Sequence, residues 1–443
     1  MGNGEMKLNR YPKYKPTGIA WLPELPEGWE LLRFKALFVQ RKERNDPIKT
    51  KNILSLTAAQ GVVPVSEKIG AGGNKPKEDL TQYDLAYPDD LVLNCMNVVA
   101  GSVGVSKYFG AISPVYYALR ARDRADVMFY NYIFQMTSFQ RSLLPLGKGI
   151  LMHESSSGKL NTVRLRISMN ALGGVKMPAP TIEMQRAIVA FLDGKCGKID
   201  RWVAAKEREV ALLKELKQAM IAEAVTGATH VARTDTARKM KPSGIPWLPE
   251  VPEGWEVKRL KWILTEIKKL SLTGEEMPLS LTASNGLIPF AEKSNRTMES
   301  ASYIGAKVVE NGQIVFNRFK ARLFAIASCR GVVSPDYAVY ATKIEVDKKY
   351  LLRLFSTPQF RQAMNGQSSG IGDGFSRVYS NELFKLLVPL PPLPTQRKIV
   401  AYIEARAAKI DAAVAGLERE VAAMKEYKQR LIADVVTGQR KVA

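Results

Sequence analysis

Apolar side chains near the C-terminus recur at the spacing of a long helix. Between residues 396 and 438 they alternate steps of four and three residues, with one irregular step. The stripe consists of Ile410, Val414, Leu417, Val421, Met424, Tyr427 and Leu431. This spacing predicts one face of an α-helix and is typical of a coiled-coil seam. A long helix of this kind cannot bury its stripe alone, so the pattern requires a second helix.

The chain contains that second helix as a copy of the first. Residues 185–227 match residues 396–438 at 24 of 43 positions. The matching stripe is Ile199, Val203, Lys206, Val210, Leu213, Leu216 and Met220. Gly194 and Gly197 weaken the first helix by about 1 kcal/mol each, but the second copy has alanines there, so we expect both to be helical. Both copies end in Thr-Gly, a common helix stop. The two helices are therefore expected to pair with each other.

A second duplicated segment precedes each half of the chain. Residues 16–35 (PTGIAWLPELPEGWELLRFK) match residues 242–261 (PSGIPWLPEVPEGWEVKRLK) at 14 of 20 positions. The repeated Pro and Gly residues exclude a helix, so we predict an irregular lead-in segment. Its tryptophans are predicted to be core anchors, with direct stacking on nucleic-acid bases as the alternative. They are Trp21, Trp29, Trp247 and Trp255.

The segments between lead-in and helix have diverged further but keep traces of duplication. Short Val/Ile/Leu/Tyr runs between Gly and Asn predict strands, and aromatic and leucine spacing predicts helices over 128–144 and 349–364. The matched runs are 54–58 with 279–283, 90–94 with 313–317, and 113–118 with 334–338. The predicted fold class is therefore α/β, with two duplicated mixed α/β domains separated by two long antiparallel coiled-coil helices.

The predicted division of the chain follows from these repeats. It comprises a first domain with its lead-in (1–177), a first spacer helix (178–228), a linker (229–241), a second domain with its lead-in (242–388) and a second spacer helix (389–443). The ends of each half are nearly identical while the middles differ. This contrast indicates that the ends share one role, whereas the two middles share a fold and recognise different things.

The charge of the chain narrows the possible partners. Lys and Arg number 65 against 43 Asp and Glu, which gives a formal charge of +22 over 443 residues. Such an excess favours nucleic acid or an acidic membrane, although a merely solvated basic surface is an alternative. No apolar run reaches 18 residues, and the N-terminus lacks the apolar core of a secretory signal. The three isolated cysteines fit a reducing compartment, so we expect a cytoplasmic protein.

Three motifs together resemble one known family. The GxxWLPExPEGWE lead-in, the helix start PPLPTQRKIV and the helix end LIADVVTGQ are similar to the specificity subunit (HsdS) of type I restriction-modification systems. The resemblance covers essentially the whole chain, and the doubled arrangement is more specific than any one motif. The first helix starts differently, with PAPTIEMQ, and neither start has the commoner acidic "EQ".

The resemblance implies a role and a set of partners. Each target recognition domain would read one half of a bipartite site in double-stranded DNA, and the helices would set the spacing and hold methyltransferase (modification) subunits, two per chain. A motor-nuclease (restriction) subunit would join this core. No cofactor is expected on this chain, because S-adenosylmethionine, ATP and Mg belong to the partner subunits.

Candidate contact residues follow from charge and from the stripe. Base edges specify a DNA sequence, while Lys and Arg also bind phosphate. The DNA-binding candidates are Arg120, Arg122, Lys148, His153, Arg318, Lys320, Arg322 and Arg377. For each of them, a solvated or phosphate-facing charge is an equally good interpretation. The partner-binding candidates are Ile199, Val203, Val210, Leu213, Ile410, Val414, Leu417 and Val421.

The alternative function is a self-sufficient DNA nuclease. Pro335-Asp336 followed by Asp347-Lys348-Lys349 fits the PD…(D/E)xK pattern, which uses carboxylates to hold Mg²⁺. The pattern is short, and the first half has Val115 in place of Asp336. A purely structural coiled-coil adaptor is a third hypothesis, which does not explain why divergence is confined to the domains.

Other catalytic motifs are weak. His153 lies beside Glu154 and the serines 155–157, but no GxSxG accompanies them. The sequence contains neither a four-ligand zinc spacing nor an Asn/Asp-Pro-Pro-aromatic methyltransferase motif. We therefore expect a non-catalytic chain.

Overall fold

The computed structural model describes residues 9–57, 60–69, 78–150, 164–229, 231, 239–282, 285–293, 302–319, 323–367 and 377–442. The chain divides into two compact units. The first unit comprises Met1–Lys206 and Arg419–Ala443, and the second comprises Glu207–Glu418. Each unit therefore contains one α/β domain and a segment of each long helix.

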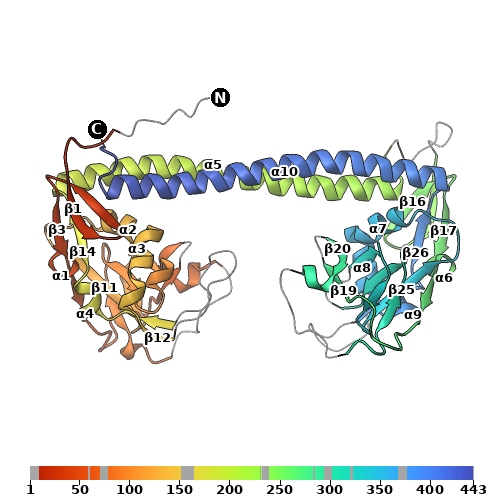
Figure 1. Ribbon diagram of the computed structural model, residues 1–443, viewed down its shortest axis with the longest axis horizontal. Helices are drawn as coiled ribbons and strands as arrows, with labels where there is room; N and C mark the ends of the chain where they lie inside the picture. The colour runs from red at the N-terminus through yellow and green to blue at the C-terminus, as the bar shows by residue number, and fades with distance from the viewer. Residues whose placement is uncertain are drawn as a thin grey trace. The chain divides into compact units, whose positions relative to one another are not determined.

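The two long helices are present as predicted. Helix α5 covers Ile182–Thr226 and helix α10 covers Leu393–Val436, with 45 and 44 residues. Each begins three residues before the repeated motif, directly after a proline-containing stretch, and each is followed by a glycine with positive φ. Within each unit, the segments of α5 and α10 lie side by side and run in opposite directions (Figure 1).

The seam of these helices differs from the predicted stripe at one position in each copy. Val203, Val210, Val414 and Val421 are buried, but Leu216 and Tyr427 are 57% and 41% exposed. Two successive three-residue steps, from 421 to 427, rotate a side chain about 120° away from the seam, whereas seven residues bring it back within about 20°. The stem of Lys428 therefore takes the seam position, and Lys217 does so in the other copy.

Repeated ion pairs fix the register of the paired helices. In the second unit the Lys217 amine lies 2.6 Å from the Asp411 carboxylate. In the first unit the Lys428 amine lies 2.7 Å from the Asp200 carboxylate. Because residue 411 matches 200 and residue 428 matches 217 in the repeat, both units use the same pair. Both lysines are about three-quarters buried, so their stems also cover apolar surface.

Each domain is built on a four-stranded antiparallel sheet with the same strand order. In the first unit the order is β4 (Phe38–Arg41), β11 (Tyr116–Ala121), β8 (Leu91–Asn94) and β9 (Val103–Val105). In the second it is β18 (Leu264–Ile267), β25 (Tyr337–Thr342), β22 (Ile314–Asn317) and β23 (Phe324–Ile326). The three repeat traces found in the sequence lie on or directly before matching strands, which confirms the duplication.

Smaller two-stranded sheets surround the main sheet. The first unit has β5 (Leu54–Thr57) with β6 (Gly61–Pro64), β7 (Asp84–Ala86) with β10 (Gly110–Ile112), and β12 (Lys148–Ile150) with β13 (Arg164–Arg166). The second unit has β19 (Leu279–Thr282) with β20 (Gly286–Pro289), and β21 (Lys307–Val309) with β24 (Gly331–Val333).

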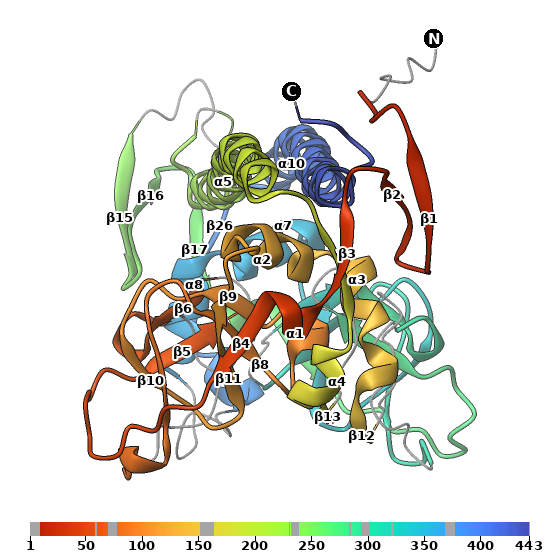
Figure 2. The ribbon, with the colours of Figure 1, turned by 90° about the vertical axis from the view of Figure 1, so that its left-hand side faces the viewer.

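Two short helices per unit replace each predicted longer one. They are α2 (Val127–Gln135) and α3 (Thr137–Ser142) in the first unit, and α7 (Lys348–Ser356) and α8 (Pro358–Asn365) in the second. The helix breaks at an extended residue, Met136 or Thr357, and Pro358 then starts the next helix in the second unit. In the first unit, α2 lies between the long helices and the strands of the main sheet (Figure 2). The remaining short helices are α1 (Phe34–Leu37), α4 (Met169–Gly173), α6 (Leu260–Ile263) and α9 (Ser380–Leu383).

The lead-in segments are more regular than predicted. Each forms a β-hairpin and a third strand: β1 (Tyr14–Ile19), β2 (Leu22–Pro26) and β3 (Glu30–Arg33), and β15 (Met240–Ile245), β16 (Leu248–Pro252) and β17 (Glu256–Arg259). The third strands pair with β14 (Lys176–Ala179) and β26 (Leu387–Leu390). Prolines are tolerated because these are two-stranded edges with a shifted register. Trp29 and Trp255 are buried as predicted, while Trp21 and Trp247 are half-buried.

Candidate nucleic-acid interface

A buried glutamine attaches each domain to a long helix. Gln185 at the start of α5 accepts a hydrogen bond from the backbone N–H of Asp126 at 2.8 Å and donates to the carbonyls of Arg124 and Pro180. Gln396 at the start of α10 accepts from the backbone N–H of Asp347, also at 2.8 Å. Both amides are buried, so losing these bonds would leave polar groups unpaired. Both copies of the repeat have a Gln-Arg pair at this position, but the sequence alone did not predict that the glutamine attaches the domain to the helix.

The same contact explains Asp347, one of the two candidate nuclease carboxylates. Asp347 caps α7 by accepting hydrogen bonds from the backbone N–H groups of Lys349 and Tyr350. Asp126 caps α2 of the first unit in the same way. Asp347 is therefore part of the repeated frame, and its role as an N-cap accounts for its position.

Asp336 belongs to a different part of the second unit. Its carboxylate forms an exposed ion pair with Arg377 at 3.5 Å. Among the residues that the structure describes, no three His, Cys, Asp or Glu side chains gather closely enough to hold a metal ion. The described residues thus provide no carboxylate cluster of the kind that metal-assisted DNA cleavage requires.

The end of each long helix packs on a lead-in. Gly438 lies against Pro26 and Trp29 in the first unit, while Gly227 lies against Pro252 in the second. In the first unit the Tyr14 hydroxyl donates to the Gly438 carbonyl at 2.7 Å. Further along, the backbone N–H of residue 441 donates to the carbonyl of residue 9 at 2.6 Å. The two ends of the described chain are therefore neighbours, as the repeat predicts.

The candidates of the first unit lie in two places. Arg120 and Arg122 are exposed at the end of β11, next to β4. Lys148 is exposed on β12, opposite Arg166 of β13 in the strand ladder. Arg166 was not among the predicted residues, and its hydrogen bond with Tyr117 raises the pKa of its guanidinium. His153 lies outside the described residues.

The candidates of the second unit are divided between surface and interior. Arg377 has an exposed guanidinium 4.5 Å above the ring centre of Phe319. Arg318 is only 15% exposed and donates to Glu266 at 2.6 Å, which makes it an interior side chain. Lys320 and Arg322 lie outside the described residues. Arg377 matches Arg166 in the repeat, so each unit places an arginine at the same position.

Each arginine lies beside the turn that follows the matching strand of its unit, β8 or β22. The backbone N–H of Ile167, next to Arg166, donates to the carbonyl of Cys95 at 2.9 Å, and the backbone N–H of Val378 donates to Arg318 at 3.2 Å. Cys95 directly follows β8, just as Arg318 follows β22. Each unit therefore places an arginine directly before a residue whose backbone bonds to the turn after β8 or β22, and the sequence of this turn differs between the units.

The predicted partner-binding residues are largely used inside the chain. Four of the eight are buried, and the other four are half-buried. The strongly exposed apolar side chains on the described part of α5 are Leu212 and Leu216, at 59% and 57%. They lie one turn apart, beside a shallow groove lined by Ala219, Ala222 and Pro358.

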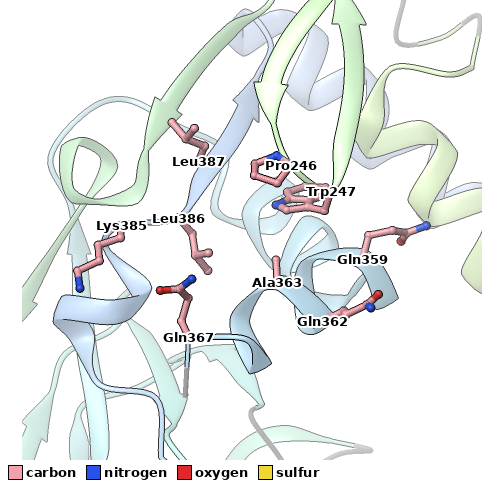
Figure 3. A pocket seen from close by; sticks show the side chains of 9 residues that line it. All are labelled: Pro246, Trp247, Gln359, Gln362, Ala363, Gln367, Lys385, Leu386 and Leu387. Atoms are coloured by element: carbon pink, nitrogen blue, oxygen red, sulfur yellow. The ribbon is translucent and has the colours of Figure 1, made fainter. Parts of the chain in front are cut away.

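A cavity of about 560 Å³ in the second unit is lined by none of the DNA-binding candidates. Trp247 from the tip of the β15–β16 hairpin faces α8, whose Gln359 and Gln362 contribute amides (Figure 3). Leu386 lies beneath them, and Lys385 is the one charged residue in its lining. Apart from Lys385, the lining consists of apolar side chains and neutral amides, which do not supply groups for acid–base or nucleophilic chemistry.

The chain has relatives of known class. The sequence model described as "Type I restriction modification DNA specificity domain" matches residues 252–419. The type I restriction enzyme EcoDI specificity subunit of Escherichia coli is 22% identical over 357 residues, which are 76% of either chain. The putative type I restriction enzyme MjaX specificity subunit of Methanocaldococcus jannaschii is 21% identical over 458 residues, 99% of either chain.

A solved structure has the same fold. A chain from a study of complex assembly and conformational transition of the type I R-M system covers 95% of this chain and 99% of its own length, with a TM-score of 0.65 and 16% identity. The duplicated two-domain fold of this chain is therefore shared with a solved chain of a type I R-M system. Over most of its length the chain is similar to specificity subunits of type I restriction-modification systems. No helix in the described residues is long and apolar enough to cross a membrane.

Proposed function

We propose that this chain is the DNA sequence-specificity subunit of a type I restriction-modification complex, and that each unit reads one half of a bipartite site. The observation that carries the proposal is the repeated arginine, Arg166 or Arg377, which lies at matching positions of the two units beside a turn whose sequence differs between them. Arginine is well suited to the O6 and N7 acceptors of guanine in the major groove. The formal charge of +22 over the whole chain favours contacts with phosphate.

The proposal makes the chain a recognition subunit and not an enzyme. The nuclease alternative has lost its support, since Asp347 caps a helix and Asp336 pairs with Arg377. S-adenosylmethionine, ATP and Mg would be bound by the methyltransferase and motor-nuclease subunits. We place the complex in the cytoplasm.

The exposed face of α5 is the proposed contact for a methyltransferase subunit. Leu212 and Leu216 are exposed on one side of this helix, whereas the seam residues are already covered. Two adjacent leucines and a neighbouring groove suit an apolar helix of a partner. The variant Leu212→Glu/Leu216→Glu should lose the partner in pull-down with the folded chain. Retained binding would place the contact elsewhere on the chain. The proposed stoichiometry is two methyltransferase subunits per chain.

The test of DNA reading is methylation mapping combined with a salt series. Cells carrying this chain and its methyltransferase partner should show one bipartite methylated motif. For the purified complex, about six phosphate contacts would lower affinity roughly 10³-fold between 50 and 200 mM salt. Absence of a motif together with a flat salt response would refute the proposal.

A further inference from the structure

The turn that follows strand β22 carries two neighbouring side chains, Arg318 and Phe319, with different contacts. The backbone N–H of Phe319 donates to the Oδ1 atom of Asn317 at 2.9 Å. The same bond joins Met96 to Asn94 in the first unit. It stabilises the path of the turn, in which both side chains are half-buried: Arg318 lies against Glu266, and Phe319 lies under Arg377.

Phe319 supports the exposed arginine. The guanidinium carbon of Arg377 lies 4.5 Å from the centre of the Phe319 ring. A guanidinium held over a ring loses less freedom on binding and keeps N–H groups available. Those groups match the O6 and N7 acceptors of guanine. The ion pair of Arg377 with Asp336 is exposed at both ends, so DNA can displace it at little cost.

Arg318 ties this turn to the rest of the unit. Its guanidinium donates to Glu266 on β18 at 2.6 Å and to the Ser380 hydroxyl at 3.3 Å. Its backbone carbonyl accepts from Val378, the residue after Arg377. Arg318 therefore joins three segments of the chain, and one of them carries the exposed arginine.

Glu266 is the centre of this buried network. It is 13% exposed and balances two cations, Arg318 and Lys307, whose amine lies 3.8 Å away. Burial, followed by the charge of Arg318, lowers the pKa of the Lys307 amine. Within the described residues, the Nε of Arg318 is buried without a hydrogen-bond partner. An incompletely paired network is a costly way to gain stability, which favours a positioning role.

The first unit has a different solution at the same positions. Gln40 and Cys95 stand where the second unit has Glu266 and Arg318, so the matching turn has no buried ion pair. There Arg166 lies beside Tyr117 instead of a phenylalanine. The ion pair of Glu266 with Arg318 is therefore specific to the second unit, although the arginine that it supports, Arg377, has a counterpart in the first unit, Arg166.

We propose that Glu266, acting through Arg318, is a positioning residue for the reading of a guanine by Arg377. The inference rests on the proposed DNA-reading function of the second unit. Glu266 holds Arg318, Arg318 holds the turn, and the turn places the Phe319 ring under the Arg377 guanidinium. Glu266 itself does not touch DNA.

The experiment compares variants of the full chain in complex with its methyltransferase subunit. Methylated sites are mapped, and binding is measured for duplexes that differ at single base pairs. Arg377→Ala should lose the preference for guanine at one base pair of one half-site, by roughly 5- to 150-fold. Glu266→Gln should relax the same base pair and leave the other half-site unchanged. The double variant Glu266→Gln/Arg377→Ala should be no more relaxed than Arg377→Ala alone, because both act through one contact.

Two further variants separate positioning from stability. Glu345→Gln removes one carboxylate from an 81% exposed position of the same unit and should leave the motif unchanged. Glu266→Gln/Arg318→Cys installs the residues of the first unit, so it removes both charges of the pair and remains informative if Glu266→Gln folds poorly. It should relax the same base pair as Arg377→Ala.

Two results would overturn the inference. One is a Glu266 variant that lowers the melting temperature while the guanine preference persists. The other is relaxation at a base pair that Arg377→Ala leaves intact. Failure of the underlying function would look different, since the unaltered chain would then direct no bipartite methylation.

Discussion

The two units bury charge at different points of the same frame. In the first unit, Arg41 on β4 forms a two-bond pair with Asp90, which also accepts from the backbone of Tyr87. In the second unit Ile267 and Gln313 occupy the matching positions, and Gln313 accepts from the backbone of Glu310. The second unit buries Glu266 and Arg318 instead.

The contrast shows what duplication preserved. Where the first unit has Arg41 and Asp90, the second has Ile267 and a neutral glutamine that keeps the backbone bond, so neither unit buries a lone charge at this point. The glutamine anchors, the helix caps and the helix-end glycines stayed the same. Attachment of domain to helix is thus common to both units, whereas the support of the recognition edge is particular to each.

The largest expected effect comes from breaking the buried pair of the first unit. Arg41→Ile leaves Asp90, whose side chain is 2% exposed, without its cation, and should destabilise the unit by about 3–5 kcal/mol. Adding Asp90→Gln reproduces the second unit and should restore most of that loss. Amide hydrogen exchange is the suitable measurement, because a chain of two units does not unfold in one step. Equal protection losses in the single and double variants would contradict the comparison.

Removing the glutamine anchors should affect both units alike. Gln185→Leu and Gln396→Leu each leave buried backbone groups unpaired and should cost about 2–4 kcal/mol locally. Faster exchange is expected at the start of α5 for the first variant and of α10 for the second. If only one of the two variants loses protection, the glutamines do not stabilise the two units equally, although their hydrogen bonds match.

The helix-end glycines provide a smaller test. Gly227 and Gly438 have φ angles of +88° and +75°, and a Cβ at either would meet a proline of the lead-in. Alanine at either position should cost about 1–3 kcal/mol. Amide hydrogen exchange of Gly438→Ala should also show faster exchange in the N-terminal strand, whereas Gly227→Ala should leave that strand protected. The reverse result would contradict the packing.

The smallest effect concerns an exposed pair. Arg44 lies 3.3 Å from Asp84 and is 58% exposed, while the second unit has Leu270 and Lys307 there. Arg44→Leu should change stability by less than about 1 kcal/mol.

The same variant has a defined pH signature. Burial raises the pKa of Asp84, and the charge of Arg44 opposes that rise. A raised carboxyl pKa favours the folded state at acidic pH, and this contribution is lost as pH rises through the folded-state pKa. Arg44→Leu should therefore raise the pKa of Asp84 further in an NMR titration. A lower value would show that the pair does not act as described.

Sequence reasoning found the features that repeat. The helices, the matching strands and the neighbouring ends follow from periodicity and from the duplication. The seam at Leu216 and Tyr427 was wrong because consecutive three-residue steps drift around a helix. The stripe residues predicted to bind a partner pack in the seam between the chain's own helices. The exposed Leu212 lies outside the stripe and was not predicted.

Contacts between residues far apart in the sequence could not be predicted from the sequence alone. Arg41 and Asp90, or Glu266 and Arg318, are 49 and 52 positions apart, and only the sheet brings them together. Arg318 therefore counted as one more surface charge, while Arg166 was overlooked beside Lys148. Comparing residue 166 with residue 377 across the repeat could have identified it.

The helices as a spacing device remain a prediction. Inserting four residues near residue 204 adds about 6 Å and little more than one turn. The methylated motif should keep both half-sites and gain one or two base pairs between them. A two-residue insertion turns the following stripe by about 200° and should abolish assembly. An unchanged gap in the first variant would show that the helices do not set the spacing.

The most direct measurement maps methylation directed by a chain in which residues 36–177 are replaced by its own residues 262–388. Both junctions lie at matching positions of the repeated frame, after Lys35 or Lys261 and before Pro178 or Pro389. The account predicts a methylated motif whose two halves are both the half-site read by the second unit. A motif that keeps the original first half-site, or two halves that both differ from the originals, would contradict it.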